Sequence, residues 1–320
     1  MRLRTIDIAK AICILLVVLG HYSPANSPAW YKTLTGVIYS FHMPLFMYLS
    51  GYLYRATLKP LKYGDFVMKK TKRLLIPYFL ISVLIISIKI LTERYMYVEN
   101  PVSWRDFLSI FYLPSAGYFL WFIYTLFLIF LIIPFFRKDY LLNTLFAASL
   151  IAQLAPFSLT DAFCIEQFRI HLFYFVSGCI TFREQAIRRR LLRLPPAAAL
   201  ISAAVVFAVL YYYQPAFSGI FASLVSLALA LTACYSVILI SRLISERTKK
   251  ISRQLLRLSA YTYTIYLFHT IFEGFAKALL LKLPFAAGLG FLLSAAIVIT
   301  AGVAGPVILG KGYAALRKRL

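Results

Sequence analysis

Long apolar segments separated by short polar loops run along the whole chain. They fall at about residues 5–22, 35–54, 74–92, 118–136, 140–157, 168–183, 196–213, 219–241, 259–281 and 285–309. Most are long enough to cross ~30 Å of hydrocarbon as helices that rise about 1.5 Å per residue. Strands in lipid would leave backbone groups unpaired, so each span must be helical. The pattern predicts an all-α, polytopic membrane bundle of about ten transmembrane helices.

The loops between these segments contain no Gly/Ser-rich linker, and the chain shows no internal repeat. No segment is long and polar enough to form a soluble domain, so we expect residues 1–320 to form a single membrane domain. The N-terminus superficially resembles a signal peptide. Asp7 and Lys10 interrupt its apolar stretch, however, and no small-x-small cleavage site follows, so it is interpreted as a retained first helix.

Composition and charge distribution agree with a membrane protein. The chain is 62% hydrophobic but carries 34 Lys and Arg against 11 Asp and Glu. Basic residues separated by long apolar runs belong to membrane loops, which argues against nucleic acid as the partner. On a ten-span topology, 26 of the 34 cations fall in the N-terminal tail, in alternate loops and in the C-terminal tail. The positive-inside rule therefore predicts that both termini are cytoplasmic.

Ionisable side chains at membrane depth are costly, so each is a candidate for function. Four histidines lie in or at the ends of spans, and the predicted topology places all four in the outer half of the bilayer: His21, His42, His171 and His269. His269 precedes Glu273 by one helical turn on the same helix face. Glu273 could orient the imidazole for function, or the two residues could form a structural polar contact. The four cysteines are scattered without metal-ligand spacing, so no metal site is expected.

Lys10 and His21 share one face of the first predicted helix, about 16 Å apart along its axis. They could line a path through the bilayer, or Lys10 could extend toward the inner surface while His21 sits at the outer interface. His42 lies just before Pro44 at a helix start, where it either caps the helix or contributes to a site.

The densest basic stretch, residues 69–73, lies at an inner helix start ahead of Pro77. It is either ordinary positive-inside charge or a clamp for a polyphosphate ligand, formed by Lys70, Lys72 and Arg73.

Several of these segments resemble the integral-membrane acyltransferase family 3. The Asp7, Lys10 and His21 spacing is similar to the family's opening helix, although the family usually has Arg where this chain has Lys10. The Phe41–Phe46 segment with Ser50-Gly51 is similar to its second-helix signature, and the basic run before Pro77 to its third. Weaker similarities are present at 120–122, 173–178 and 259–269. The resemblance covers nearly the whole chain in length and span count, and is closest to sugar O-acetyltransferases similar to fucose 4-O-acetylases.

The resemblance implies transfer of an acetyl group from cytoplasmic acetyl-CoA to a hydroxyl of a cell-surface or lipid-linked glycan, in the cytoplasmic (inner) membrane. It makes His21 the expected general base or acyl carrier, with Lys10 and His42 assisting, and Lys70, Lys72 and Arg73 the expected CoA phosphate ligands. A transporter or flippase for a lipid-linked glycan would also explain intramembrane charges, but usually shows a two-fold repeat. A non-catalytic assembly partner would leave Lys10 and His21 without a role.

Overall fold

The computed structural model describes residues 3–24, 27–95, 98, 100–184, 196–282 and 290–316, and every regular element in these ranges is a helix. The basic stretch 185–193 and residues 317–320, on which part of the topology prediction rests, lie outside them. Within these ranges, five helices are long and apolar enough to cross a membrane: Tyr63–Thr92, Tyr118–Phe136, Ala197–Ala216, Gly219–Arg247 and Phe291–Leu316. The ten-span count and the cytoplasmic termini stay predictions.

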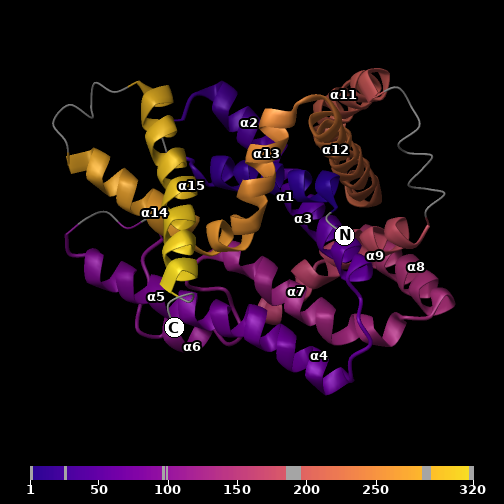
Figure 1. Cartoon of the computed structure of the whole chain (residues 1–320), viewed down its shortest axis with the longest axis horizontal. Helices are drawn as coiled ribbons and strands as arrows, with labels where there is room; N and C mark the ends of the chain where they lie inside the picture. The colour runs from indigo at the N-terminus through magenta and orange to yellow at the C-terminus, as the bar shows by residue number, and fades with distance from the viewer. Residues whose placement is uncertain are drawn as a thin grey trace. The chain divides into compact units, whose positions relative to one another are not determined.

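The helices follow the apolar segments of the sequence closely. In chain order the α-helices are α1 (Arg4–His21), α2 (Ala29–Tyr39), α3 (His42–Ala56), α4 (Tyr63–Lys70), α5 (Ile76–Thr92), α6 (Asp106–Ser109), α7 (Trp121–Ile132), α8 (Asp139–Leu154), α9 (Ile165–Arg183), α11 (Pro196–Tyr213), α12 (Gly219–Arg247), α13 (Lys249–Leu258), α14 (Thr262–Lys282) and α15 (Phe291–Leu316) (Figure 1). A π-helical turn, η1 (Thr71–Leu75), joins α4 to α5, and short 3₁₀ turns extend α7, α9, α11 and α14.

The chain divides into two compact units. Unit 1 comprises Met1–Phe46, Leu194–Tyr213 and Ala228–Leu320, and unit 2 comprises Met47–Arg193 and Gln214–Leu227. In unit 1, α1 packs against α2, α13, α14 and α15, and α14 packs along α15. In unit 2, α9 packs against α7 and α8.

The segment predicted as one span over 35–54 consists of two helices. The chain leaves α2 after Tyr39 and begins α3 at His42, with Ser40 and Phe41 between them. Ser40 satisfies the end of α2 with its own side chain, whose hydroxyl donates to the Val37 carbonyl at 2.7 Å. Pro44 lies in the first turn of α3, where its missing N–H costs no helical hydrogen bond. The break places His42 at a helix start, as the sequence predicted.

In unit 2 the backbones of α3 and α9 touch at two glycines. A Cβ on Gly51 would lie 1.8 Å from the Phe175 carbonyl oxygen, and one on Gly178 would lie 2.0 Å from the Tyr48 carbonyl oxygen. Only residues without a side chain allow helices to approach this closely, which is the usual role of small residues between membrane helices. The contact fixes α3 against α9 along the aromatic core of this unit.

The π turn between α4 and α5 follows from Pro77. This proline has no N–H to donate to the Arg73 carbonyl, and its ring would collide with that carbonyl in a regular α-helix. The chain widens instead, and the Ile76 N–H donates to the Thr71 carbonyl, five residues back. Such turns accommodate one extra residue within a helix and occur often at functional sites. The turn contains Lys72 and Arg73, two of the predicted phosphate ligands.

Candidate functional site

His21 is the last residue of α1, and the end of that helix is held by two tyrosines from α2. The hydroxyl of Tyr31 donates to the Leu19 carbonyl at 2.8 Å, and that of Tyr39 donates to the Gly20 carbonyl at 3.1 Å. Carbonyls in the last turn of a helix have no partner within it, so these bonds fix the helix end as well as the loop. The Tyr39 ring lies 6.3 Å from the His21 ring. The position of His21 is therefore set from two elements.

His42 reaches the same region from the start of α3. Its ring lies 5.1 Å from the Tyr39 ring, so this tyrosine neighbours both His21 and His42. The Nδ1 atom of His42 lies 2.9 Å from the Ile38 carbonyl oxygen. A carbonyl only accepts hydrogen bonds, so Nδ1 carries the proton, and the neutral ring has its lone pair on Nε2. The Cys13 thiol donates to the His42 carbonyl at 3.2 Å and ties α1 to α3.

The ring of His269, from α14, packs beside that of His21, with ring centroids 5.0 Å apart. Its Nδ1 lies 2.8 Å from the Tyr266 carbonyl oxygen and 3.1 Å from that of Ile265, so Nδ1 donates here too and the neutral form of the ring would carry its lone pair on Nε2. The side chain is fully buried. The sequence identified His269 as a candidate for an oriented imidazole, and the structure brings it to His21.

Glu273 lies one turn beyond His269 and is buried against α15. A Cβ on Gly302 would come within 2.8 Å of both Cγ and Oε1 of Glu273, so the glycine makes the room that the carboxyl group occupies. The Oε1 atom is buried and has no hydrogen-bond partner in the part of the chain that the structure describes. Such an acceptor is expensive to bury and is available to a donor group that arrives in the site.

Lys10 lies at the other end of α1. Its ammonium pairs with the Asp7 carboxylate at 3.6 Å, and both side chains are about one-fifth to one-quarter exposed. The pair joins two of the three residues of the opening motif. Lys10 and His21 thus belong to one helix, as predicted, but lie toward opposite ends of it.

The predicted phosphate ligands lie in unit 2, around the junction of α4 and η1. An open groove of about 500 Å³ is lined there by Asp65, Met68, Lys69, Lys72 and Arg73. The three cations face one space that is wide enough for a polyanionic ligand. Two of the three predicted phosphate ligands, Lys72 and Arg73, thus line this groove with Lys69, and their role in binding phosphate stays a prediction.

Lys70 points elsewhere. Its ammonium lies 3.4 Å from the centre of the Phe130 ring and 5.3 Å from that of Phe66. Cations over aromatic faces are stabilised by the ring quadrupole, by about 2 kcal/mol or more where water is excluded. In this arrangement Lys70 does not line the groove of Lys69, Lys72 and Arg73.

His171, the fourth histidine, lies in unit 2. Its ring is 4.6 Å from the Trp121 ring, and its Nδ1 is 2.9 Å from the Gln167 carbonyl. Among the described residues no group of three or more His, Cys, Asp or Glu side chains could hold a metal ion. All four cysteines are buried, and none forms a disulfide bond.

Tyr39, whose ring neighbours those of His21 and His42, was not among the residues that the sequence predicted. Its signal in the sequence is weak, because Tyr39 is one of 23 tyrosines in this chain. The pairing of His21 with His269 was equally hidden, because a contact between distant segments has no local pattern. The shared depth of the histidines was the one available signal.

Comparison with known proteins places these motifs in a family. Residues 3–311 match the model of acyltransferase family 3, which is described as an acyltransferase domain. Nodulation protein NolL of Sinorhizobium fredii is 38% identical over 92 residues, which are 27% of this chain and 25% of the relative. NolL of Mesorhizobium japonicum is 30% identical over 122 residues, 32% of this chain and 33% of the relative.

The aligned part thus spans a third or less of the length of either nodulation protein. No solved structure matches this chain. The family match, in contrast, runs through both units and contains every candidate residue described above. The chain therefore belongs to the membrane-bound acyltransferase family 3.

Proposed function

We propose that this protein is an O-acetyltransferase that moves an acetyl group from cytoplasmic acetyl-CoA to a hydroxyl of a cell-surface or lipid-linked glycan. The observation that carries the proposal is the convergence of three imidazoles, His21, His42 and His269, in a chain of the acyltransferase family. The strongly basic loops support a cytoplasmic (inner) membrane location with both termini inside.

A hydroxyl is a weak nucleophile at neutral pH, so transfer to an alcohol needs a base. In the proposed reaction a ring nitrogen of His21 takes the proton of the acceptor hydroxyl, and the hydroxyl oxygen attacks the thioester carbonyl carbon. The carbon–sulfur bond breaks as the ester bond forms, and the CoA thiolate leaves with the proton from the imidazole. A variant of this route, in which His21 first carries the acetyl group, uses the same groups.

The remaining candidates have supporting roles in this proposal. His269 and His42, with their Nδ1 atoms held by backbone carbonyls, keep fixed orientations around His21 and assist it. Lys10, paired with Asp7, sits along α1 at the end away from His21. The donor is a polyanion, and Lys69, Lys72 and Arg73 offer a groove lined with cations for its phosphates. No metal takes part in these steps.

Two measurements test the proposal. Surface glycans are compared by mass spectrometry in cells with and without the protein, and the expected result is the loss of one acetyl group per acceptor sugar. The purified protein is then incubated with acetyl-CoA labelled in the acetyl group and a glycan acceptor. Unchanged glycan acetylation together with no label transfer would contradict the proposal. A drop in the amount of surface glycan, with unchanged acetylation of what remains, would favour a flippase instead.

A further inference from the structure

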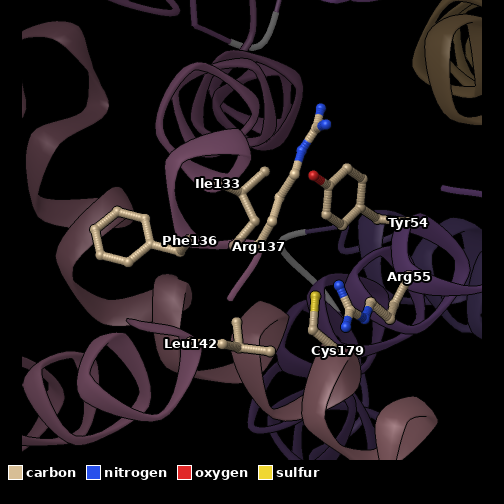
Figure 2. A pocket seen from close by; sticks show the side chains of 7 residues that line it. All are labelled: Tyr54, Arg55, Ile133, Phe136, Arg137, Leu142 and Cys179. Carbon is tan, nitrogen blue, oxygen red and sulfur yellow. The ribbon is translucent and has the colours of Figure 1, made fainter. Parts of the chain in front are cut away.

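Two arginines and a tyrosine surround a small cavity in unit 2, away from the groove described above. The cavity has a volume of about 10 Å³ and is lined by Tyr54, Arg55, Ile133, Phe136, Arg137, Leu142 and Cys179 (Figure 2). This is the space of one water-sized atom group. Its polar lining atoms are two guanidinium groups, a phenol and a thiol.

Positive charge exceeds negative charge around this cavity. Arg55 and Arg183 share the carboxylate of Asp139, at 3.7 and 3.4 Å, and Asp139 is mostly exposed. Arg183 also pairs with Glu184 at 3.0 Å. Within the described ranges, no carboxylate lies at ion-pair distance from Arg137. Because arginine is always charged, this leaves more cations than anions at the site.

The polar atoms that face each other here are shielded from solvent. The Nε atom of Arg137 and the hydroxyl of Tyr54 are both buried, and within the described ranges the polar neighbour of the hydroxyl is the Arg137 guanidinium itself. Figure 2 shows the Arg137 side chain running past the Tyr54 ring, with its guanidinium group beside the tyrosine hydroxyl. Arg137 is half-buried with its Nε shielded, and a buried guanidinium nitrogen with no anion beside it carries a desolvation cost. An anion that accepts hydrogen bonds from both groups would remove that cost.

We propose that Arg55, Arg137 and Tyr54 bind a phosphoryl group. Guanidinium groups recognise phosphate through paired N–H donors, and two arginines beside a hydroxyl match its several acceptor oxygens. The cavity admits a single oxygen of such a group while the rest faces its open side. Both arginines lie in segments predicted to be cytoplasmic, where phosphorylated nucleotides and anionic lipid headgroups are found.

This site is separate from the groove of Lys69, Lys72 and Arg73. Phe66 of α4 packs against the Tyr54 ring, with centroids 6.1 Å apart. Lys69 and Lys72 line the groove and not the cavity, and none of the residues that the structure describes lines both spaces. One ligand with two phosphate groups, or two different ligands, would satisfy this arrangement.

The phosphoryl group has two candidate sources. One is the 3′-phosphate of coenzyme A, an assignment that rests on the proposed function. The other is the headgroup of an anionic phospholipid, since basic pockets at the cytoplasmic side of membrane helices commonly hold such groups. Acetyl-CoA, acetyl-dephospho-CoA, which lacks the 3′-phosphate, and phosphatidylglycerol are the probes that separate them.

The test uses the full chain purified in a detergent without phosphate groups. The variant is Arg137→Gln, and the matched control is Lys138→Gln, which removes a neighbouring exposed cation outside the cavity lining. Calorimetry measures the two nucleotides, and native mass spectrometry measures retained phosphatidylglycerol. We expect Arg137→Gln to lose at least about tenfold in affinity for one of the phosphate probes, as for a charged hydrogen bond worth about 1.5–3 kcal/mol, and Lys138→Gln to keep it.

Loss of affinity for acetyl-CoA, with unchanged affinity for acetyl-dephospho-CoA, would assign the site to the 3′-phosphate of the donor. Loss of retained lipid alone would assign it to the headgroup. Wild-type affinity of folded Arg137→Gln for all three probes would overturn the site. If that variant does not fold, Arg137→Lys and Tyr54→Phe carry the same test. A wild-type protein that binds lipid through Arg137 but binds no acetyl-CoA would contradict the donor in the proposed function and leave this site standing.

Discussion

The imidazole rings of His21 and His269 lie 5.0 Å apart and are tilted by 56° to each other, although they come from the first and the penultimate helix of the structure. The contact joins α1 to α14 at the point where α2 contributes Tyr39. Each ring therefore limits the orientations of the other. A reaction that uses one imidazole is expected to depend on both.

His21→Ala should abolish glycan acetylation while the protein remains in the membrane. Removing a general base costs about 10²–10⁴-fold in rate, and removing an acyl carrier costs at least as much. Acetylation is measured by mass spectrometry of surface glycans, and protein amount by immunoblot of membranes. His171→Asn is the control, because its amide replaces the hydrogen bond to the Gln167 carbonyl and unit 1 is untouched. Normal acetylation in His21→Ala would exclude the catalytic role.

His269→Asn should lower kcat by about tenfold or more with little change in KM for acetyl-CoA. An asparagine amide donates to the carbonyls of Ile265 or Tyr266 much as Nδ1 does, so folding should be kept. What is lost is the ring beside His21. Steady-state kinetics with purified protein measures the two constants. If the unfolding temperature fell together with kcat, the lower rate would reflect a damaged fold, and His269 would have only a structural role.

Neutralising Lys69, Lys72 and Arg73 together should weaken acetyl-CoA binding by at least about tenfold, because charged hydrogen bonds to phosphate contribute about 1.5–3 kcal/mol each. Lys70→Gln alone should have a smaller effect on binding and a larger one on stability, since its ammonium lies over Phe130. Calorimetry and thermal unfolding separate the two effects. Unchanged affinity in the triple variant would remove the groove as the donor site.

Gly51→Ala should destabilise unit 2 by roughly 1–3 kcal/mol or more, because the new methyl group would overlap the Phe175 carbonyl. Gly178→Ala should act in the same way through the Tyr48 carbonyl. Gly274→Ala is the matched control, since nothing lies within 4 Å of a Cβ there and alanine favours helix. Thermal unfolding in detergent measures all three variants. Equal stability of Gly51→Ala and Gly274→Ala would contradict the close approach of α3 and α9.

Acid should weaken the start of α9 through Glu166. The Arg169 guanidinium, 2.6 Å away, together with the Leu159 N–H, lowers the pKa of the Glu166 carboxyl below its usual 4.5. A depressed carboxyl pKa stabilises the fold above the unfolded value, and this stabilisation is lost as pH falls below 4.5 through the folded value. The unfolding temperature should therefore fall more steeply between pH 7 and pH 3 in wild type than in Glu166→Gln. Parallel curves would show that the pair contributes nothing to stability.

The sequence was sufficient for the parts of this structure that depend on local periodicity. Apolar length predicted the helices, and the Pro44 context predicted that His42 opens one of them. The break at Ser40 was missed, because the apolar run continues through it and only the local hydrogen bond to Val37 marks it. Lys70 was grouped with Lys72 and Arg73 by proximity in sequence. In the structure its ammonium lies over the rings of Phe66 and Phe130, and Phe130 is sixty residues away along the chain.

The π turn at Thr71–Leu75 makes the cation groove sensitive to the length of the chain at this point. Deleting Thr71 would remove one residue from this connection and rotate the side chains of α4 by about 100° relative to those of α5. Lys69 would then turn away from Arg73, and a different pair of cations would face the groove. A one-codon deletion, without any substitution, would thus be enough to change which cations line this groove.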